Sequence, residues 1–325
     1  HRVKSGDLQL NITDDSPLGK VLDKYPNTEF SIFTGTVGEN RKAVIEIHDK
    51  KEVLVFVKIA LTEAAKILVE NEAKCLQNLN TFQFSSLVVP KLLSKNKLDT
   101  IGLSNIKPKN FQQNTTLSQL HIDAMSELYA KTHVQTKWTN LNTLTESKER
   151  VENLLLDFEV INELEKSRIL SLANKLLTLI SILEEEDEKL VTTLSHGDFT
   201  PWNMYSTKNV LHLFDWELSE NDTPILFDLF HFIFQSEAMV KHTEYTGIGK
   251  EIQRVLQMQN TKNIITNFDV NVNKHYIFYL VYNVAYYLSK YSKQEHLHEQ
   301  VFWLIDIWEY TVNDAIDKQG VLFEK

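Results

Sequence analysis

The chain of 325 residues has little of what disulfide-bonded, secreted or membrane-spanning proteins need. Its single cysteine, Cys75, cannot form a disulfide within the chain, which favours a reducing compartment. The longest apolar run, residues 276–282, falls far short of the roughly 20 residues that cross a bilayer. The first ten residues are polar and mixed, unlike a secretory signal. We therefore expect a cytoplasmic protein without membrane insertion.

Basic residues are also too few for a typical nucleic-acid-binding surface. Lys and Arg number 34 against 44 Asp and Glu, which gives a formal net charge of −10. Binding to a phosphate backbone requires clustered positive charge, so this balance disfavours a nucleic-acid partner. The hydrophobic share of 42% is ordinary for a globular protein, and the length suits about two domains. The oligomeric state stays open.

Glycine is scarce, at nine residues, so the pair Gly35 and Gly38 stands out between two expected strands. Glycine allows the backbone to approach a ligand such as a phosphate closely. The spacing is neither Gly-x-Gly-x-x-Gly nor Gly-x-x-x-x-Gly-Lys followed by Ser or Thr, and two glycines in a hairpin also form an ordinary turn. Both the phosphate-binding and the turn interpretation stay open.

The hydrophobic pattern changes once along the chain. The first part predicts a short helix beginning at Ser16, strands at 29–34, 42–48 and 53–60, a helix at 62–79, and strands at 85–93 and 99–106. These elements suit a small antiparallel sheet with one helix packed on it. Beyond Pro108, helical patterns dominate, at about 117–133, 145–164, 167–185, 225–241, 249–259, 273–293 and 295–318, with an interruption near 189–215.

One pair of charges lies in an apolar setting. Lys58 sits inside the apolar strand 53–60. Glu72 is the one charged residue on a helical stripe formed by Leu61, Ala65, Leu68, Glu72, Cys75 and Leu79. A buried charge is costly unless it is paired, and a strand packs against the helix that follows it, so these two side chains are candidate partners. The alternative is that Lys58 reaches solvent at a sheet edge and Glu72 lies at a border.

Polar residues that suit phosphoryl transfer gather in residues 196–203 (HGDFTPWN) and 214–217 (FDWE). Two short strands joined by a turn separate the segments, so a hairpin should bring Asn203 close to Asp215. Carboxylate and amide oxygens are the ligands that Mg²⁺ prefers, and Asp198 would be free to accept a hydroxyl proton. The alternative, that Asp198 and Asp215 only cap turns, is weakened by their occurrence in order with Gly35, Gly38, Lys58 and Glu72.

With these motifs the sequence resembles the aminoglycoside phosphotransferase and choline kinase family of the protein-kinase-like fold. The resemblance covers most of the chain and is sharpest at 196–203 and 215–217. It implies that Asp198 is the catalytic base, that Asn203 and Asp215 bind Mg²⁺, and that Lys58 and Glu72 orient the phosphates of ATP. It also implies that Asp228 supports the catalytic loop from behind. The candidates for nucleotide contacts are completed by Gly35, Gly38, Asn105 and Ile106. His196, Glu217 and Trp202 are candidates for contacts to the acceptor or for supporting the site residues from behind.

The resemblance implies an α+β fold with two lobes, an antiparallel-sheet N-lobe at 1–106 and a mostly helical C-lobe at 107–325. It further implies a kinase that phosphorylates a hydroxyl of a small molecule with ATP and Mg²⁺. The chain departs from protein kinases because residues 215–224 leave little room for an activation segment. Trp202 replaces the more usual glycine before the metal-binding asparagine. A sugar, an aminoglycoside, a choline-like alcohol and an amino-acid alcohol remain open as acceptors, and a silent binding module and a protein kinase are the alternatives.

Overall fold

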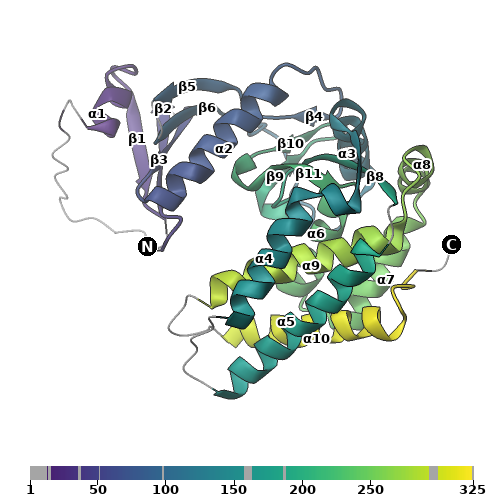
Figure 1. Cartoon of the computed structure of the whole chain (residues 1–325). Helices are drawn as coiled ribbons and strands as arrows, with labels where there is room; N and C mark the ends of the chain where they lie inside the picture. Colours follow the sequence, from purple (N-terminus) through teal and green to yellow (C-terminus); the bar gives the residue numbers. More distant parts are fainter. Residues whose placement is uncertain are drawn as a thin grey trace. The chain divides into compact units, whose positions relative to one another are not determined.

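The computed structural model forms two compact units (Figure 1). It describes Thr13 and residues 16–35, 38–50, 52–96, 99–156, 163–185, 188–292 and 299–323. The first unit comprises residues 1–82 and 89–107, and the second comprises 83–88 and 108–325. Segment 83–88 belongs to the second unit because its strand pairs there with β10 (Leu211–Leu213) and because Ser85 and Ser86 both donate to the carboxylate of Glu127.

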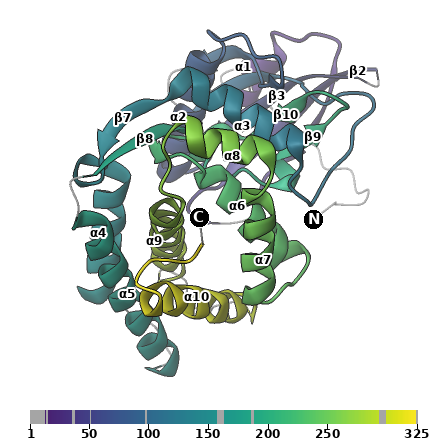
Figure 2. The same cartoon turned by 90° about the vertical axis from the view of Figure 1, so that its right-hand side faces the viewer.

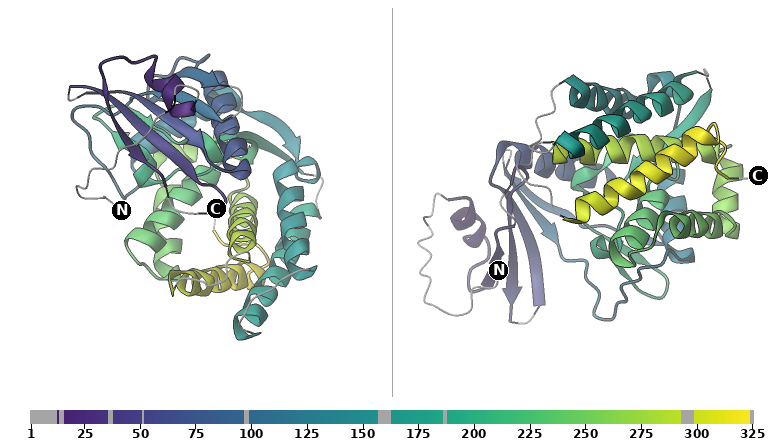
Figure 3. Two further views of the ribbon diagram at one scale, coloured as in Figure 1. Left: turned by 90° about the vertical axis from the view of Figure 1, so that its left-hand side faces the viewer. Right: turned by 90° about the horizontal axis from the view of Figure 1, so that it is seen from below.

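The first unit is a five-stranded sheet with helices. Its elements are α1 (Pro17–Leu22), β1 (Glu29–Phe33), β2 (Lys42–Asp49), β3 (Glu52–Ala60), α2 (Glu63–Leu79), β5 (Leu92–Asn96) and β6 (Thr100–Ser104). The strand order is β1-β2-β3-β6-β5 and every pair is antiparallel, which confirms the expected sheet (Figure 3). The expected strand at 85–93 is wrong. Its first half, β4 (Leu87–Val88), pairs in the second unit, and the first unit's strand begins only at Leu92.

Alternation along the two central strands builds the core of this sheet. Alternate residues are buried over 43–47 in β2 and 55–59 in β3, and they pack in one cluster, which consists of Ala43, Ile45, Ile47, Val55, Val57 and Ile59. Leu18 and Val21 of α1 pack against this cluster. Because neighbouring strand residues point to opposite faces, Lys58 points away from it.

Helix α2 begins where the side chain of Thr62 accepts the backbone N–H of Ala65, an ordinary N-cap. Most of the expected apolar stripe is buried, including Ala65, Glu72 and Leu79. Leu61 is 48% exposed because it lies before the cap, so its assignment to the buried stripe is wrong.

The second unit contains two small sheets and most of the helices. Its strands are β4, β7 (Val134–Lys137), β8 (Lys189–Ser195), β9 (Met204–Ser206), β10 (Leu211–Leu213) and β11 (Glu220–Pro224), in the orders β4-β10-β9 and β11-β8-β7. Its helices are α3 (Gln119–Thr132), α4 (Asn142–Leu156), α5 (Glu163–Glu184), α6 (Phe227–Gln235), α7 (Tyr245–Leu256), α8 (Gln259–Asn267), α9 (Val272–Tyr291) and α10 (Glu299–Asp317). Short 3₁₀ turns η1 (Trp138–Asn140), η2 (Pro201–Asn203) and η3 (Trp216–Leu218) and a π-helical turn η4 (Ser236–Val240) complete it.

Several boundaries differ from the sequence prediction. Strands β7 and β11 and helix α8 were not predicted, because each is short and has no apolar period of its own. The helix predicted at 225–241 begins only after Leu226, which has a left-handed backbone, and it continues as η4. Residues 157–162 of the helix predicted at 145–164 lie outside the described residues, as do 293–298 of the last two predicted helices.

Helices α4, α5, α9 and α10 pack against one another within the second unit (Figure 2). Helix α9 supplies much of their shared core, including Phe278, Tyr279 and Leu280, which are not exposed to solvent. Helix α6 also contacts α9, so the residues of α6 are fixed from two sides, by α9 and by the sheet loops described below. Among the described helices, none combines the length and the apolar character that a membrane-spanning segment needs.

Candidate active site

The expected ion pair of the first unit is present. Lys58 lies in the central strand, opposite Val44 of β2 and Ile101 of β6, and its Nζ donates to Oε2 of Glu72 at 2.6 Å. The Glu72 side chain is fully buried and that of Lys58 is 12% exposed. Because β3 is hydrogen-bonded on both sides, the alternative of a lysine at a sheet edge is excluded.

The two glycines between β1 and β2 differ from each other. Gly35 has φ +65°, and a Cβ there would lie 3.0 Å from the carbonyl oxygen of Lys42. Gly38 has an unstrained backbone and open space around the position of a Cβ. Residues 36 and 37, between them, lie outside the described residues. The backbone therefore requires glycine only at Gly35, and contact of either glycine with a nucleotide stays a prediction.

Asn105 and Ile106 follow the end of β6. The Asn105 side chain donates from Nδ2 to the carbonyl of Val53 at 3.0 Å and accepts the backbone N–H of Lys107 at 2.9 Å. The Nδ2 bond thus holds the connecting segment to β3, and the Oδ1 bond fixes the turn of that segment. Ile106 is half-buried directly after it. Their contact with a nucleotide stays a prediction.

In the second unit, the loop after β8 is held from behind by Asp228. The two oxygens of this buried carboxylate accept the backbone N–H groups of His196 at 2.7 Å and Gly197 at 3.2 Å. Burial raises the pKa of Asp228 above its ordinary value, although these donors and His196 oppose that effect. Gly197 has φ +81°, and a Cβ there would lie 1.9 Å from the carbonyl oxygen of Leu218. This position therefore accepts only glycine.

The His196 side chain holds the loop together. Its ring accepts the backbone N–H of Asp198 at Nδ1, at 3.3 Å, and donates from Nε2 to the carbonyl of Phe214 at 2.9 Å. The ring is fully buried beside Trp216, with ring centroids 4.7 Å apart, and burial lowers its pKa. Both nitrogens thus bind groups inside the protein and support the loop, and contact of His196 with an acceptor stays a prediction.

Asp198 is held on both carboxylate oxygens. Oδ2 accepts Nδ2 of Asn203 at 2.8 Å, and Oδ1 lies 3.2 Å from Nε2 of His231. Burial by itself would raise the pKa of Asp198, but the hydrogen bond from His231, together with the charges of His231 and His196, outweighs burial and lowers that pKa. The carboxylate is therefore ionised at neutral pH and fixed in orientation, as a group that receives a proton from an alcohol must be.

A hairpin brings Asn203 and Asp215 together, as the sequence predicts. Strands β9 and β10 pair antiparallel, and the N–H of Phe214 donates to the carbonyl of Asn203 at 3.0 Å. Nδ2 of Asn203 also donates to the carbonyl of Asp198 at 3.0 Å, so its amide oxygen is the atom suited to a cation. Asp215 has φ +68°, a left-handed conformation that aspartate tolerates better than most residues. An amide oxygen and a carboxylate on adjoining strand ends fit the preference of Mg²⁺ for hard oxygen donors.

His231 is the functional candidate that sequence reasoning missed. It lies three residues after Asp228, one turn along α6, and it is 3% exposed. A signal was available, because the two are the polar residues at helical spacing in the otherwise apolar run FDLFHFIF. Glu72 is identified as a polar group on a buried helical face, and the same criterion identifies Asp228 and His231. Helix α6 thus reaches the loop of residues 196–203 at two points.

The candidates Trp202 and Glu217 lie in the short turns η2 and η3, next to Asn203 and close to Asp215 in the chain. Trp202, in η2, is 44% exposed. Glu217, in η3, is partly buried. Burial of Tyr286 in α9 raises the pKa of that tyrosine, and the negative charge of Glu217 adds to the effect. The negative charge of Glu217 therefore lies within electrostatic range of Tyr286. Contact of Trp202 or Glu217 with an acceptor stays a prediction.

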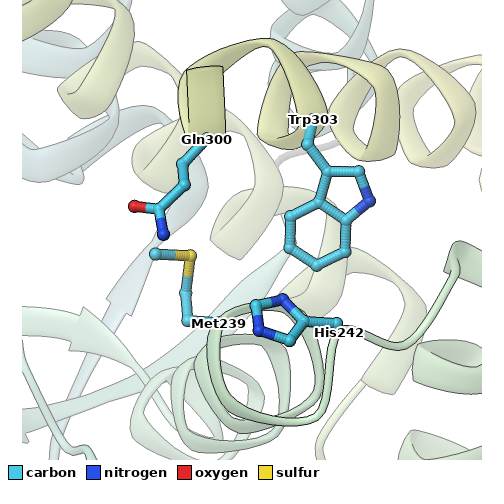
Figure 4. Close-up of a pocket in the computed structure, with 4 residues that line it drawn as sticks. All are labelled: Met239, His242, Gln300 and Trp303. Atoms are coloured by element: carbon cyan, nitrogen blue, oxygen red, sulfur yellow. The ribbon is translucent and has the colours of Figure 1, made fainter. Parts of the chain in front are cut away.

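A pocket of about 350 Å³ lies farther along the helix that carries His231. Met239 of η4 and His242 face Gln300 and Trp303 of α10 across it (Figure 4). The rings of His242 and Trp303 are 5.5 Å apart and tilted. Met239 follows His231 by eight residues, or about two helical turns. This pocket belongs to the second unit alone and offers mostly apolar surface.

Comparison with known proteins identifies the fold. No protein-family model and no curated protein sequence matches the chain. Among solved structures, the aminoglycoside phosphotransferase APH(2'')-Ib with bound ADP aligns over 96% of this chain and 100% of its own, with a TM-score of 0.52 and 13% identity. Amicoumacin kinase hAmiN in complex with AMP-PNP, Ca²⁺ and Ami aligns over 92% and 94%, with a TM-score of 0.57 and 12% identity. Glucosamine kinase in complex with glucosamine, ADP and inorganic phosphate covers 92% and 84%, with a TM-score of 0.51 and 11% identity.

The chain has the two-lobed kinase-like fold. These similar structures are small-molecule kinases, and they share the small antiparallel sheet and the larger helical lobe. The expected fold class is therefore confirmed. Identities of 11–13% show the fold and leave the reaction to be argued from the residues of this chain.

Proposed function

We propose that the protein is an ATP- and Mg²⁺-dependent phosphotransferase that acts on a hydroxyl of a small molecule. The observation that carries this proposal is the Asp198 carboxylate, which is kept ionised and is oriented by Asn203 and His231. The hairpin that follows brings Asp215 beside Asn203, so a base and a set of hard oxygen ligands occur in one loop system. Phosphoryl transfer depends mainly on positioning and charge stabilisation, and this arrangement provides both.

Each residue has a distinct role in the proposed reaction. Asp198 orients the acceptor hydroxyl and takes its proton while the oxygen forms a bond to the γ-phosphorus and the bond to ADP breaks. Asn203 and Asp215 hold Mg²⁺, which supplies positive charge against the phosphates. Lys58, fixed by Glu72, neutralises the α- and β-phosphates. Gly35, Gly38, Asn105 and Ile106 are proposed to contact the nucleotide.

The segment after Asp215 favours a small acceptor over a protein. It forms η3 and then β11, which pairs antiparallel with β8, and α6 begins at Phe227. These elements occupy the stretch in which a protein kinase has its activation segment. A silent binding module is disfavoured because the base and both proposed metal ligands are present.

The single buried cysteine supports a cytoplasmic location, and the acidic charge disfavours a nucleic-acid partner.

The acceptor is a sugar, an aminoglycoside, a choline-like alcohol or an amino-acid alcohol. Aromatic rings can hold a cationic acceptor such as a choline-like alcohol. At Tyr282 and Tyr286, however, the guanidinium of Arg150 lies 5.6 Å and 5.8 Å from the two rings, so a cation of the protein itself already covers this pair. Tyr279 and Trp308 are core residues. Amino sugars and aminoglycosides are the first compounds to test, because solved structures of this fold hold gentamicin or glucosamine and the chain is acidic.

Binding and transfer can be tested separately. Mg·ATP should raise the melting temperature, since a ligand at 100 times its Kd stabilises by about 2.7 kcal/mol. Asp198→Asn should bind Mg·ATP normally while ADP release with the best acceptor falls by roughly 10²–10⁴-fold. Asp215→Asn should lose activity by a similar factor. Asp317→Asn, the same change at the exposed end of α10, is the control and should behave like wild type.

Two results would contradict the proposal. The first is a folded wild-type protein whose melting temperature does not respond to millimolar Mg·ATP. The second is tight Mg·ATP binding without ADP release, with water or with any alcohol of a broad panel, which favours the silent module. Full activity in excess EDTA would remove the metal from the proposal.

A further inference from the structure

We infer that His231 is a positioning residue for the proposed reaction: its Nε2–H group fixes the carboxylate of Asp198 in the orientation that meets the acceptor hydroxyl. This inference rests on the proposed phosphotransferase function and assigns a role to a group outside the catalytic loop and the metal-binding hairpin. The observations are the 3.2 Å separation of Nε2 from Oδ1 of Asp198 and the near-complete burial of the ring.

The ring of His231 is held in place by its aromatic neighbours. Phe227, one turn earlier on α6, stacks almost parallel to it, with ring centroids 6.1 Å apart and planes 7° apart. Tyr279 of α9 meets it edge-on at 6.1 Å. An imidazole packed on two sides in a close-packed interior keeps one orientation. His231 therefore presents Nε2 to Asp198 as a fixed donor.

The direction of the hydrogen bond defines what His231 can do. An ionised carboxylate only accepts hydrogen bonds, so Nε2 carries the proton in this contact. A ring nitrogen that already carries a proton cannot receive the one that Asp198 takes from an acceptor. Nδ1 is buried and has no hydrogen-bond partner among the residues that the structure describes. The geometry therefore supports a role for His231 in positioning the carboxylate of Asp198, and not in passing on its proton.

Two donors on two oxygens determine the plane of the carboxylate. Asn203 binds Oδ2 from the loop, and His231 binds Oδ1 from α6. Without His231 the carboxylate keeps only the donor that is also a proposed metal ligand, and it can rotate about its last bond. A misplacement of about 1 Å at a reacting group lowers a rate by as much as roughly 10²-fold.

Helix α6 thus controls the backbone and the base of the catalytic loop through different residues. Asp228 binds backbone N–H groups, so its loss disturbs the loop as a whole. Among the residues that the structure describes, the hydrogen bond of His231 goes to the side chain of Asp198 and not to the loop backbone, so its loss should leave the loop folded. This separation makes the inference testable by substitution at His231.

The experiment compares two substitutions at His231 with one at a matched histidine. His231→Leu removes the donor at similar volume, and His231→Gln restores an amide N–H near the position of Nε2. His275→Leu is the control, because that ring is equally buried, at 4% exposed, and bonds to the carbonyl of Asn271. With Mg·ATP and water or the best acceptor, we expect His231→Leu to lower kcat roughly 10–100-fold at unchanged KM for ATP. His231→Gln should recover most of this loss, and His275→Leu should keep the kcat of wild type per folded molecule.

A second measurement does not depend on turnover. In histidine-labelled protein, the ¹H–¹⁵N signal of Nε2–H of His231 should move in Asp198→Asn and stay unchanged in Asp317→Asn. A signal unaffected by Asp198→Asn overturns the inference, even if His231→Leu fails to fold. Wild-type turnover that His231→Leu retains, or a loss that His231→Gln does not repair, overturns it and leaves the proposed function intact. A wild type that binds Mg·ATP without turnover overturns the proposed function and this inference with it.

Discussion

The two units hold their functional charges in different ways. In the first, a strand and the helix that follows it each present one charged side chain, and Lys58 and Glu72 bind each other directly. In the second, Asp198 lies on an irregular loop, and its position depends on backbone hydrogen bonds to Asp228 and on side chains from η2 and α6. One arrangement depends on regular secondary structure, and the other depends on the backbone of the loop.

This difference determines what each unit tolerates. An ion pair between two regular elements can be removed without changing the backbone, since the strand and the helix pack through other residues. A loop held by Gly197 at positive φ, and followed by left-handed Asp215 and Leu226, has no regular structure to maintain it. Strained residues of this kind persist only where the surroundings fix them, and they cluster at functional sites. We therefore expect backbone changes to harm the second unit most and charge changes to harm the first.

The largest effect should come from Gly197→Ala. A methyl group there would lie 1.9 Å from the carbonyl oxygen of Leu218, so the loop must move, and the backbone at φ +81° disfavours any other residue. We expect kcat to fall at least as far as in Asp198→Asn, with a loss of stability of about 5 kcal/mol or more, because both a backbone clash and a strained φ are introduced. Activity assays and urea unfolding measure the two effects.

Gly38→Ala is the matched control from the first unit. A Cβ at Gly38 meets no atom within 4 Å, and its backbone is unstrained, so stability should change by less than about 1 kcal/mol. A weaker Mg·ATP response in Gly38→Ala would support its contact with the nucleotide. Equal stability losses in the two variants would contradict the contrast between the units.

The next largest effect should come from the ion pair. Lys58→Met removes the cation 2.6 Å from a fully buried carboxylate, and breaking such a pair costs about 3–5 kcal/mol. Glu72→Leu should cost less, because the partly exposed Lys58 can extend toward water. The double variant Lys58→Met/Glu72→Leu should recover much of the stability in urea unfolding, since a well-packed apolar pair often replaces a buried ion pair without loss.

Mg·ATP then distinguishes function from stability. None of these three variants should show the normal increase in melting temperature, because all lack the proposed phosphate-binding lysine or its partner. A double variant as stable as wild type that still responds fully to Mg·ATP would show that the pair has only a structural role.

The same contrast explains how much of the fold could be predicted. The sheet of the first unit follows from alternation along 42–48 and 53–60, and α2 from its apolar period, because these elements are long and regular. The prediction of one strand at 85–93 was wrong because a local pattern cannot show that Leu87 pairs with Leu211, more than a hundred residues away. Strands β7 and β11 escaped prediction for a similar reason: they complete a sheet around β8 and contain few apolar residues of their own.

The site was predictable where chemistry and spacing coincide. Asp198, Asn203 and Asp215 stand out as polar residues around a hairpin, and the hairpin is present. The support of the loop was not predictable from the residues alone: that Asp228 binds two N–H groups depends on the exit angle of α6 after Leu226. The contact of His231 with Asp198 spans 33 residues and depends on the same angle, so sequence spacing indicates a paired face without identifying the partner.

The smallest predicted effect concerns Glu220, a largely buried carboxyl group near the start of β11 that contrasts with Asp198. Hydrogen bonding from His231 and nearby positive charge lower the pKa of Asp198, whereas burial, together with Glu146 and Asp222, raises the pKa of Glu220 to about 7. In the unfolded chain Glu220 ionises near its ordinary value of 4.5, so ionising it opposes folding as the pH rises through 7. Its contribution to stability is therefore complete below pH 4.5 and is lost by about pH 8.

Glu220→Gln should consequently melt higher than wild type at pH 8, by about 2–4 °C for each kcal/mol relieved, and should equal wild type near pH 4. The comparison must be made between variant and wild type at each pH, because His121 and His275 add an opposite trend. Burial lowers the pKa of each to about 4, so their contribution to stability is lost as the pH falls below 6.5. Glu152→Gln, the same change at an exposed position of α4, is the control and should follow wild type throughout. A melting-temperature difference between Glu220→Gln and wild type that does not grow from pH 4 to pH 8 would show that the Glu220 carboxyl is as well solvated as one at the surface.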